Sequence, residues 1–278
     1  MRIILLGTGT PMPDPKYAGT SCLIEVGGHA LLFDCGPGAT VRAVAAGFKP
    51  TQIDYLFFTH HHFDHDLDYP HLVLTRWDQG AGKIRDLRVY GPPPTERMTR
   101  LLFEEGGVYD ADLRARTLSP LSTVLHVARG GTLPRLRPVV IAQDVSPGVV
   151  CSTAGWLVRC APARHSEHLI SLAYRVESDE GTVVIAGDTE PCRGVVELAR
   201  GADLLIHMCV LEPHATVGGV ARAEEAGAVA RDAEVKALAL VHMGAAADEP
   251  GTAERLARDA GRVFRGRVIV GRDLLEVP

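Results

Sequence analysis

The sequence lacks the cysteine pairs, long apolar runs and basic clusters that mark several classes of protein. None of its six cysteines belongs to a C-x-x-C pair, which argues against a structural zinc knuckle. Six cysteines are too sparse for a disulfide scaffold in 278 residues, so free thiols and a cytoplasmic location are expected. No apolar run approaches the ~20 residues that span a membrane, and the opening RIILLG is too short for a signal-peptide core. No membrane partner is therefore expected.

Positive charge is not concentrated anywhere along the chain. The formal net charge is −5, and the basic residues are mostly scattered arginines without a lysine or arginine run. A surface that grips a nucleic-acid backbone usually carries such a run, so composition disfavours RNA or DNA as the main partner. Apolar residues make up 46% of the chain, enough for a sizeable buried core. We predict one domain over residues 1–278.

The order of apolar segments predicts an α/β (α+β) fold with sheets in the middle and helices outside. Strands are expected at 2–7, on either side of Gly27 and Gly28, at 53–60 and at 87–91. The second half alternates strands and helices and closes with one strand over 266–277. Between 95 and 150 we predict a helix over 95–106 and irregular structure beyond it, because that stretch is rich in Pro, Gly and Arg.

Residues 57–70, FFTHHHFDHDLDYP, concentrate imidazoles and carboxylates directly after an apolar strand. Such groups are costly to bury unless something pairs them. His60, His62, Asp64 and His65 could turn from one loop towards one cavity, and their atoms suit zinc, iron or manganese. Four ligands are more than one tetrahedral catalytic ion should take from a single loop, so a site with two metal ions would divide them naturally.

Three later segments also end in a residue that can hold a metal. APARHSEH places His165 in a loop before a strand, VVIAGDTEP ends a strand at Asp188, and LALVHMG ends a strand at His242. In layered α/β folds, functional sites gather at strand ends. Four separate segments that each end in His or Asp are hard to explain by chance.

The whole set of candidate ligands resembles that of the metallo-β-lactamase fold hydrolases, and most of all that of their ribonuclease Z-like branch. The segments LGTGTPMP, LLFDCGPGA, GDT and LVHM fall where that branch has similar segments. The resemblance implies a four-layer αββα sandwich with two metal ions at one sheet edge. It assigns seven side chains to them: His60, His62 and His165 on one ion, Asp64, His65 and His242 on the other, and Asp188 between the two.

The resemblance implies hydrolysis by a hydroxide that bridges two divalent ions, most readily Zn²⁺, with Mn²⁺ or Fe²⁺ as alternatives. Two ions ~3.5–4 Å apart lower the pKa of a shared water and polarise the ester under attack. Asp188 would balance charge and fix the metal spacing, and Asp64 could also accept the proton of the nucleophile. Asp34, Asp66 and Asp68 are candidates for orienting the metal-bound histidines.

Departures from ribonuclease Z bear on the substrate. Short ribonuclease Z enzymes carry a tRNA-gripping arm between the segments of His165 and Asp188, whereas only residues 166–187 lie between them here, room for a hairpin. Ribonuclease Z also has a glutamate and a histidine near the scissile phosphate. Here Met208 and Gly218 or Gly219 stand in those places. We therefore expect a small-molecule substrate and do not expect tRNA as a partner.

Several other side chains are candidates for contacting the substrate. Tyr69, Arg76 and Trp77 follow the metal loop and could line a pocket, although simple packing is the plainer interpretation. Histidines near the ligand segments are also candidates: His168, His207 and His214. His61 is expected to point away from the metals, because it sits between two ligands in an extended segment.

The bond that is cleaved stays open at this stage. A phosphodiester comes first, because the resembled branch mostly cleaves such bonds; a lactone, aryl ester or aryl sulfate is the alternative on the same site. Arginine near the metals would favour the phosphodiester, and Arg76, Arg164 and Arg193 keep that option open. A metal-binding protein without catalysis is the alternative from another class, disfavoured because all seven ligands are present. The resemblance also implies a homodimer.

Overall fold

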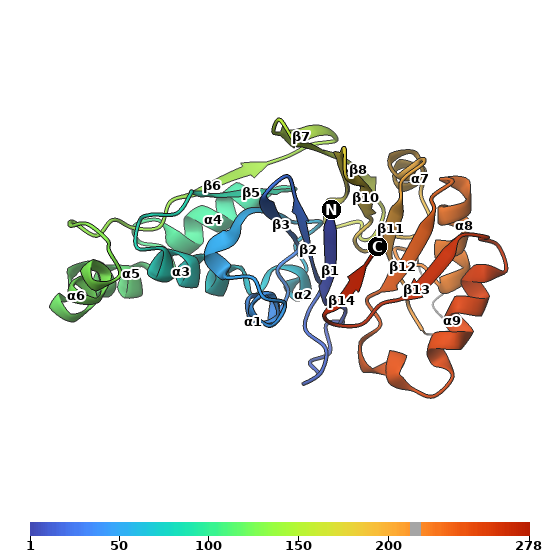
Figure 1. The fold of residues 1–278 in the computed structure, drawn as a ribbon, viewed down its shortest axis with the longest axis horizontal. Helices are drawn as coiled ribbons and strands as arrows, with labels where there is room; N and C mark the ends of the chain where they lie inside the picture. Colours follow the sequence, from blue (N-terminus) through green and yellow to red (C-terminus); the bar gives the residue numbers. More distant parts are fainter. Residues whose placement is uncertain (212–217) are drawn as a thin grey trace.

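Two β-sheets packed face to face form the middle of the molecule, and helices cover both outer faces (Figure 1). The computed structural model describes residues 1–211 and 218–278. The predicted αββα sandwich is confirmed. Within those two ranges, no helix has the length and apolar character needed to cross a membrane.

The first sheet combines strands from both ends of the chain. Its order is β14-β1-β2-β3-β4-β5-β6, antiparallel from β14 to β3 and parallel from β3 to β6. Its strands are β1 (Arg2–Gly7), β2 (Ser21–Val26), β3 (His29–Phe33), β4 (Ile53–Phe57), β5 (Leu87–Gly91), β6 (Val140–Asp144) and β14 (Leu275–Val277).

The second sheet comes from the C-terminal half. Its order is β13-β12-β11-β10-β9-β8-β7, parallel from β13 to β10 and antiparallel from β10 to β7. Its strands are β7 (Gly148–Ser152), β8 (Trp156–Ala163), β9 (Ser171–Ser178), β10 (Gly181–Ile185), β11 (Leu204–Met208), β12 (Ala237–Val241) and β13 (Arg267–Val270).

Helices are divided between the two outer faces. On the first sheet's side are α1 (Ala39–Ala45), α2 (Phe63–Asp66), α3 (Tyr69–Gly80), α4 (Thr95–Phe103), α5 (Asp110–Leu118) and α6 (Pro120–Ala128). On the second sheet's side are α7 (Arg193–Ala199), α8 (Ala223–Asp232) and α9 (Thr252–Gly261). Two short 3₁₀ turns complete the described elements, η1 (Pro50–Gln52) and η2 (Gly244–Asp248).

The strand sequences are apolar on both faces because both faces are buried. Along β1, Ile3 and Leu5 enter the core between the two sheets, while Ile4 and Leu6 enter the core under the helices. This alternation follows from the two-residue period of a strand, and burial on both sides explains why residues 3–6, IILL, form one continuous apolar run.

Two predictions about secondary structure are wrong. The stretch after residue 106 is not irregular, because it forms helices α5 and α6 and strands β6 and β7. The expected closing strand over 266–277 is two strands in different sheets: β13 pairs with β12, and β14 crosses over to pair with β1. The break comes at Gly271–Asp273, where the Thr8 N–H and hydroxyl donate to Asp273 Oδ1 and draw the chain to the first sheet.

Helix α6 presents an apolar face to solvent at one end of the molecule's long axis (Figure 1). Leu121, Val124, Leu125 and Ala128 recur at helical spacing and are all exposed, with Val124 64% exposed. An apolar helix face normally packs against something. The tip formed by α5 and α6 is therefore a candidate contact surface.

Candidate metal centre

Four loops at one edge of the sandwich bring the predicted ligands together. Each ligand segment follows the end of a strand: His60 follows β4, His165 follows β8, Asp188 follows β10 and His242 follows β12. Strands β4, β10 and β12 run parallel to neighbours in their sheets, so the side chains that follow them gather at their C-terminal edge. Helix α2 then turns Asp64 and His65 inwards, where both are buried.

Glycine permits the backbone to pack closely behind this loop. A Cβ atom at Gly36 would lie 2.0 Å from the carbonyl oxygen of Asp64, so only glycine allows this approach. Next to it, the Cys35 N–H donates to the carbonyl of His65 at 2.6 Å. The loop after β3 therefore fixes the position of α2 and of the ligands on it.

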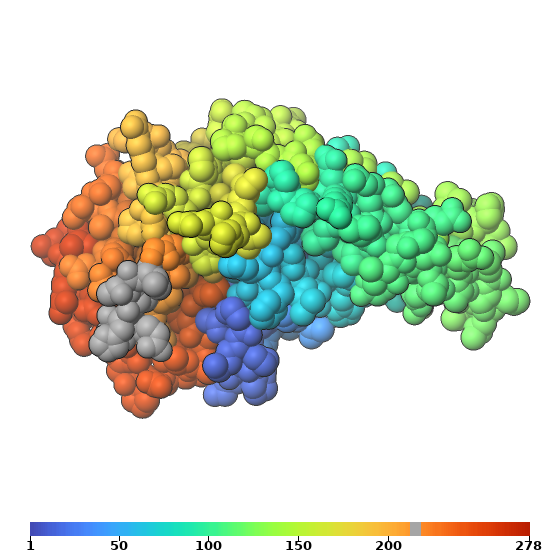
Figure 2. Space-filling model, turned by 180° about the vertical axis from the view of Figure 1, so that it is seen from behind, coloured from blue at the N-terminus to red at the C-terminus, as the bar shows by residue number. Residues whose placement is uncertain are grey.

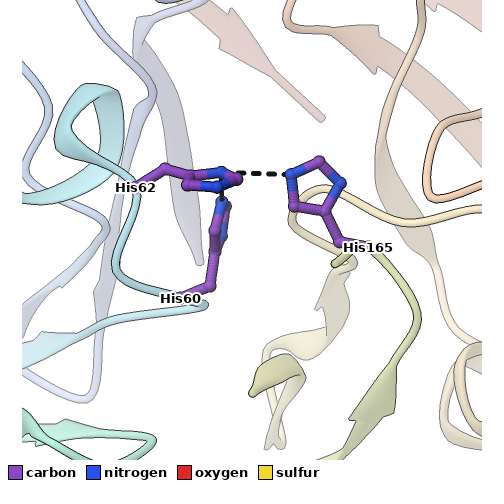
Figure 3. Close-up of side chains that lie close together, drawn as sticks. All are labelled: His60, His62 and His165. Carbon is purple, nitrogen blue, oxygen red and sulfur yellow. Dashed lines mark hydrogen bonds between the residues drawn. The ribbon is translucent and has the colours of Figure 1, made fainter. Parts of the chain in front are cut away.

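Three histidines form the more open group of candidate ligands. The Nδ1 atom of His62 lies 3.0 Å from Nε2 of His60 and 3.1 Å from Nε2 of His165 (Figure 3). His60 is fully buried, whereas His62 and His165 are partly exposed. Three imidazole nitrogens that converge on one point are a donor set that suits zinc.

The second group joins carboxylates to histidines. The Nε2 atom of His242 lies 3.2 Å from Oδ2 of Asp64 and 3.2 Å from Oδ2 of Asp188. The other oxygen of Asp188 is 3.6 Å from Nε2 of His65, and its Oδ2 is 3.7 Å from Nε2 of His165. Asp188 thus contacts members of both groups.

The Nε2 atom of His65 indicates that this cluster suits a cation. It is buried and has no hydrogen-bond partner among the described residues, while its Nδ1 lies 2.8 Å from Oδ2 of Asp34. Leaving a buried ring nitrogen unpaired costs free energy. Oxygens of Asp64 and Asp188 each lie 3.6 Å from it, so a divalent cation would satisfy all three atoms.

Charges in the cluster are strongly coupled. Burial opposes protonation of His65 and His242, yet Asp188 and Asp34 hold the pKa of His65 well above its ordinary value, and Asp188 and Asp64 raise the pKa of His242. Burial would raise the pKa of Asp188, but the charges of His242 and His65 hold it well below its usual range. Without a cation, the site is a network of buried ion pairs.

Metal binding should therefore release protons. Because Asp188 and Asp34 raise the pKa of His65, and Asp188 and Asp64 raise that of His242, protons compete with a cation for these rings more strongly than for ordinary histidines. We expect zinc affinity to rise with pH for as long as these two rings lose protons. Calorimetric zinc titration in buffers of different ionisation enthalpy measures the released protons. Affinity that is independent of pH, with no proton released, would contradict this charge assignment.

Asp34 is the candidate orienting carboxylate that touches a ligand. It contacts His65 and also accepts hydrogen bonds from the N–H of Thr59 at 2.7 Å and its hydroxyl at 2.8 Å. The same hydroxyl lies 3.0 Å from Nδ1 of His60. Thr59 thus links two ligand histidines, a role that the sequence analysis missed. Its position between an apolar strand and His60 is the signal that could have suggested it.

The other two candidate orienting carboxylates, Asp66 and Asp68, contact residues that are not candidate ligands. Asp66 lies 3.2 Å from Nδ1 of His61, whose Nε2 lies 2.8 Å from the hydroxyl of Thr95. His61 points away from the metal ligands, as predicted. Asp68 accepts the N–H of Thr40 at the start of α1 at 2.6 Å.

Three predicted substrate residues, Tyr69, Arg76 and Trp77, lie outside the cluster of candidate ligands. Helix α3 buries Tyr69, Leu72, Val73 and Arg76 on one face, so the Tyr69 hydroxyl meets Thr99 in the core. Arg76 is buried too, where it donates to Asp54 and to the carbonyl of Ile53. Trp77 donates to the carbonyl of Leu136, beside Arg135. The structure does not bring these three side chains into the ligand cluster, because helical spacing turns them to the sheet and to the 132–140 segment.

The predicted substrate histidines have different positions. His168 is exposed on the loop that follows His165. His207 is buried at the end of β11, where its Nδ1 donates to the carbonyl of Met208 at 2.9 Å and burial lowers its pKa. His214 lies outside the described residues.

Comparison with known proteins identifies the family. A family model described as a beta-lactamase superfamily domain matches residues 29–243. Ribonuclease Z of Mycobacterium bovis (strain BCG / Pasteur 1173P2) is 32% identical over 288 residues, covering 100% of this chain and 98% of that protein. The chain belongs to the metallo-β-lactamase superfamily. It is a ribonuclease Z-like, metal-dependent hydrolase of that superfamily.

Solved structures of other superfamily proteins share this fold. The metallo-β-lactamase fold protein YhfI of Bacillus subtilis superposes with a TM-score of 0.76 at 20% identity, covering 99% of this chain and 98% of that one. Human tRNase Z, short form, superposes with a TM-score of 0.71 at 20% identity, covering 100% and 99%. At these identities the likeness concerns the fold alone.

The expectation that tRNA is not a partner is wrong as stated. It conflicts with the full-length relatives, which carry the name ribonuclease Z. One of the departures from ribonuclease Z that led to this expectation, Met208 in the place of a glutamate, also has a structural explanation. Met208 is buried, and its sulfur accepts a hydrogen bond from the N–H of Thr189 at 3.1 Å. This position therefore helps to hold the loop that carries Asp188. A difference at a packing position does not exclude an RNA substrate.

Proposed function

We propose that this superfamily member is a phosphodiesterase that works with two divalent metal ions, most readily Zn²⁺. The position of Asp188 carries the proposal, because its carboxylate lies within 3.7 Å of His165 in one group and of His65 and His242 in the other. A carboxylate shared in this way supports two ions rather than one.

The ligand side chains have separate tasks in this proposal. His60, His62 and His165 would hold one ion, and Asp64, His65 and His242 the other. When bound, two such ions would supply an activated water as the nucleophile near neutral pH and would polarise the phosphoryl group. Asp188 would balance the positive charge, Asp34 holds the His65 ring in place, and Asp64, whose Oδ2 lies next to His242, would accept the proton that the nucleophile gives up.

RNA is the first natural substrate class to test. The relatives named ribonuclease Z match this chain over its full length, and that name supports a phosphodiester in RNA. A small phosphodiester is the second candidate. It is supported by the described chain between His165 and Asp188, where β9 and β10 form a plain hairpin.

A lactone or aryl ester is the alternative bond. The observation that favours it is the pairing of the arginines that could have met a phosphate. Arg76 donates to Asp54, Arg164 lies 3.1 Å from Glu190, and Arg193 donates to Glu197. With these three arginines already paired, the metal ions alone would have to bind the negative charge of a phosphodiester, whereas a lactone or aryl ester carries no such charge.

Initial rates after zinc or manganese loading test the function. The substrates are bis(p-nitrophenyl) phosphate, a 3′-extended tRNA precursor and a p-nitrophenyl ester. We expect metal-dependent cleavage of the first substrate and slower or no cleavage of the ester. Cleavage of the ester alone, by protein with two ions bound, would overturn the phosphodiesterase in favour of the alternative. If the first substrate is cleaved, cleavage of the tRNA precursor favours RNA as the natural substrate class, and failure to cleave it favours a small phosphodiester.

We also propose that the chain forms a homodimer through α6. The apolar face of α6 carries no charged residue, so two copies can meet there without placing like charges together. Exposed Leu118, Leu133 and Leu136 extend the apolar surface around it.

Charge placed on this face should break the dimer. Val124→Asp is expected to weaken self-association at least about a hundredfold, because it buries an unpaired carboxylate in the contact. Val41→Asp is the matched control, since Val41 is 61% exposed on α1, away from the tip. Analytical ultracentrifugation measures both. A dimer that persists in Val124→Asp, or a wild-type chain that stays monomeric at high concentration, would contradict the proposal.

A further inference from the structure

Glu190 lies two residues after Asp188 and is not one of the candidate ligands, yet its side chain contacts two other loops. Its Oε1 lies 3.1 Å from Nε of Arg164, and its Oε2 accepts a hydrogen bond from the N–H of Gly219 at 2.8 Å. The backbone adds a third contact, because the N–H of Glu190 donates to the carbonyl of Arg164 at 2.8 Å. Glu190 therefore joins the loop that carries His165 to the segment that leads into α8.

Gly219, which Glu190 holds by its N–H, also contacts His165. The carbonyl oxygen of Gly219 lies 2.6 Å from Nδ1 of His165, and because a carbonyl only accepts hydrogen bonds, this ring nitrogen carries a proton and donates it. In a neutral ring the other nitrogen, Nε2, then has no proton, and it lies 3.1 Å from Nδ1 of His62 (Figure 3). The Gly219 carbonyl thus selects the tautomer that offers Nε2 to a metal ion.

The close approach of these two loops depends on glycine. A Cβ atom at Gly219 would lie 1.9 Å from the carbonyl oxygen of His165, and the φ of Gly219 is +90°, in the left-handed region that favours glycine. A Cβ atom at Gly218 would lie 2.7 Å from Oε2 of Glu190. The backbone of residues 218–219 therefore lies directly against both Glu190 and His165.

His165 has few other contacts that could orient its ring. It is partly exposed, whereas His60 and His65 are fully buried. The segment around residue 165, yellow in Figure 2, lies at the surface next to the cyan segment that carries the first candidate ligands. Within residues 1–211 and 218–278, the ring makes one hydrogen bond outside the cluster of candidate ligands, the bond to Gly219. The direction of this ring therefore depends on how firmly the Gly219 peptide is held.

We infer that Glu190 is a positioning residue for the more open group of candidate ligands: it holds the Gly219 peptide, whose carbonyl fixes the tautomer and direction of the His165 ring. The inference rests on the proposed two-metal function and adds a residue that acts through another side chain. The hydrogen bond to Gly219 carries this role. The pair with Arg164 contributes less, because the arginine side chain is 73% exposed and solvent screens such pairs.

Two substitutions at Glu190 separate its hydrogen bond from its charge, with zinc affinity measured by competition with a chelator. Glu190→Leu removes the acceptor and should weaken one of the two zinc affinities about tenfold to a hundredfold. Glu190→Gln removes the charge but keeps an amide oxygen for the N–H of Gly219, so it should retain most of the affinity. Glu197→Gln is the matched control, because Glu197 on α7 also pairs with an arginine, and both affinities should stay unchanged.

The tautomer of His165 gives a readout that does not depend on turnover. Proton–nitrogen correlation spectra of protein with isotope-labelled histidine should show the His165 proton on Nδ1 in the wild type and in Glu190→Gln, and a mixture of tautomers in Glu190→Leu. Glu190→Ala replaces Glu190→Leu if the latter does not fold. An unchanged tautomer in the variant without an acceptor, or losses in Glu190→Gln as large as those in Glu190→Leu, would overturn the inference.

The same spectra of metal-free protein separate this inference from the proposed function. The hydrogen bond from His165 to Gly219 is present without a metal ion, so its dependence on Glu190 can be measured whether or not the protein cleaves a diester. If the wild type cleaves no phosphodiester, the proposed function fails, and the tautomer in Glu190→Leu still decides whether Glu190 positions His165.

Discussion

Replacing Asp188 with alanine should lower the metal-dependent rate on bis(p-nitrophenyl) phosphate by at least about a thousandfold, roughly 4 kcal/mol of barrier. Asp188 is the carboxylate that contacts both ligand groups, so its loss removes a ligand and the charge that balances both ions. It also leaves His65 and His242 without their main counter-charge. We expect metal affinity and rate to fall together.

A matched control separates this effect from a general loss of negative charge. Asp179 is an exposed aspartate in the turn between β9 and β10, and Asp179→Ala should keep the wild-type rate. Asp188→Asn, which keeps the shape but not the charge, should resemble Asp188→Ala. If Asp188→Ala retained more than a tenth of the rate at full metal loading, the shared-ligand role would be wrong.

The largest expected effect on stability is at Phe57. Its ring lies fully buried between the two sheets, stacked on Phe33 at 4.7 Å and on Tyr90 at 5.3 Å between centroids, with Tyr174 at 5.6 Å. Phe57→Ala removes these contacts and leaves a cavity that close-packed neighbours fill only partly. We expect the free energy of unfolding to fall by about 3–5 kcal/mol.

Guanidinium unfolding of metal-free protein measures this loss without the contribution of bound ions. Val149→Ala, at an exposed position of β7, is the control and should change stability by less than about 0.5 kcal/mol. A loss under about 1 kcal/mol at Phe57 would mean that the stacked ring column does not hold the sheets together.

The gathering of the candidate ligands could be predicted from the sequence because its signals are local. Three of the four segments place His or Asp shortly after an apolar strand, β4, β10 or β12, and parallel strands deliver such residues to one edge. His165 lies instead between the antiparallel strands β8 and β9. The sandwich could be predicted for the same reason, since burial on both sheet faces leaves continuous apolar runs such as residues 3–6.

Other features depend on contacts that no short segment reveals. Arg135 packs on Trp77 and pairs with Asp78, which holds the 129–137 stretch against α3 in a region where Pro, Gly and Arg suggest irregular structure. The split of the last strand depends on Asp273 meeting Thr8 from the other end of the chain. The position of Tyr69 could have been predicted, because Tyr69, Leu72, Val73 and Arg76 follow the 3, 4 and 7 spacing of a buried helix face.

Metal content measured alongside activity tests the central claim most directly. Chelated protein would be titrated with zinc while bound metal per chain, by mass spectrometry, and the rate on bis(p-nitrophenyl) phosphate are followed together. A site built around a shared Asp188 predicts saturation at about two ions per chain and full activity only with the second ion. Saturation at one ion with full activity, or a rate that survives complete chelation, would contradict a two-metal hydrolase.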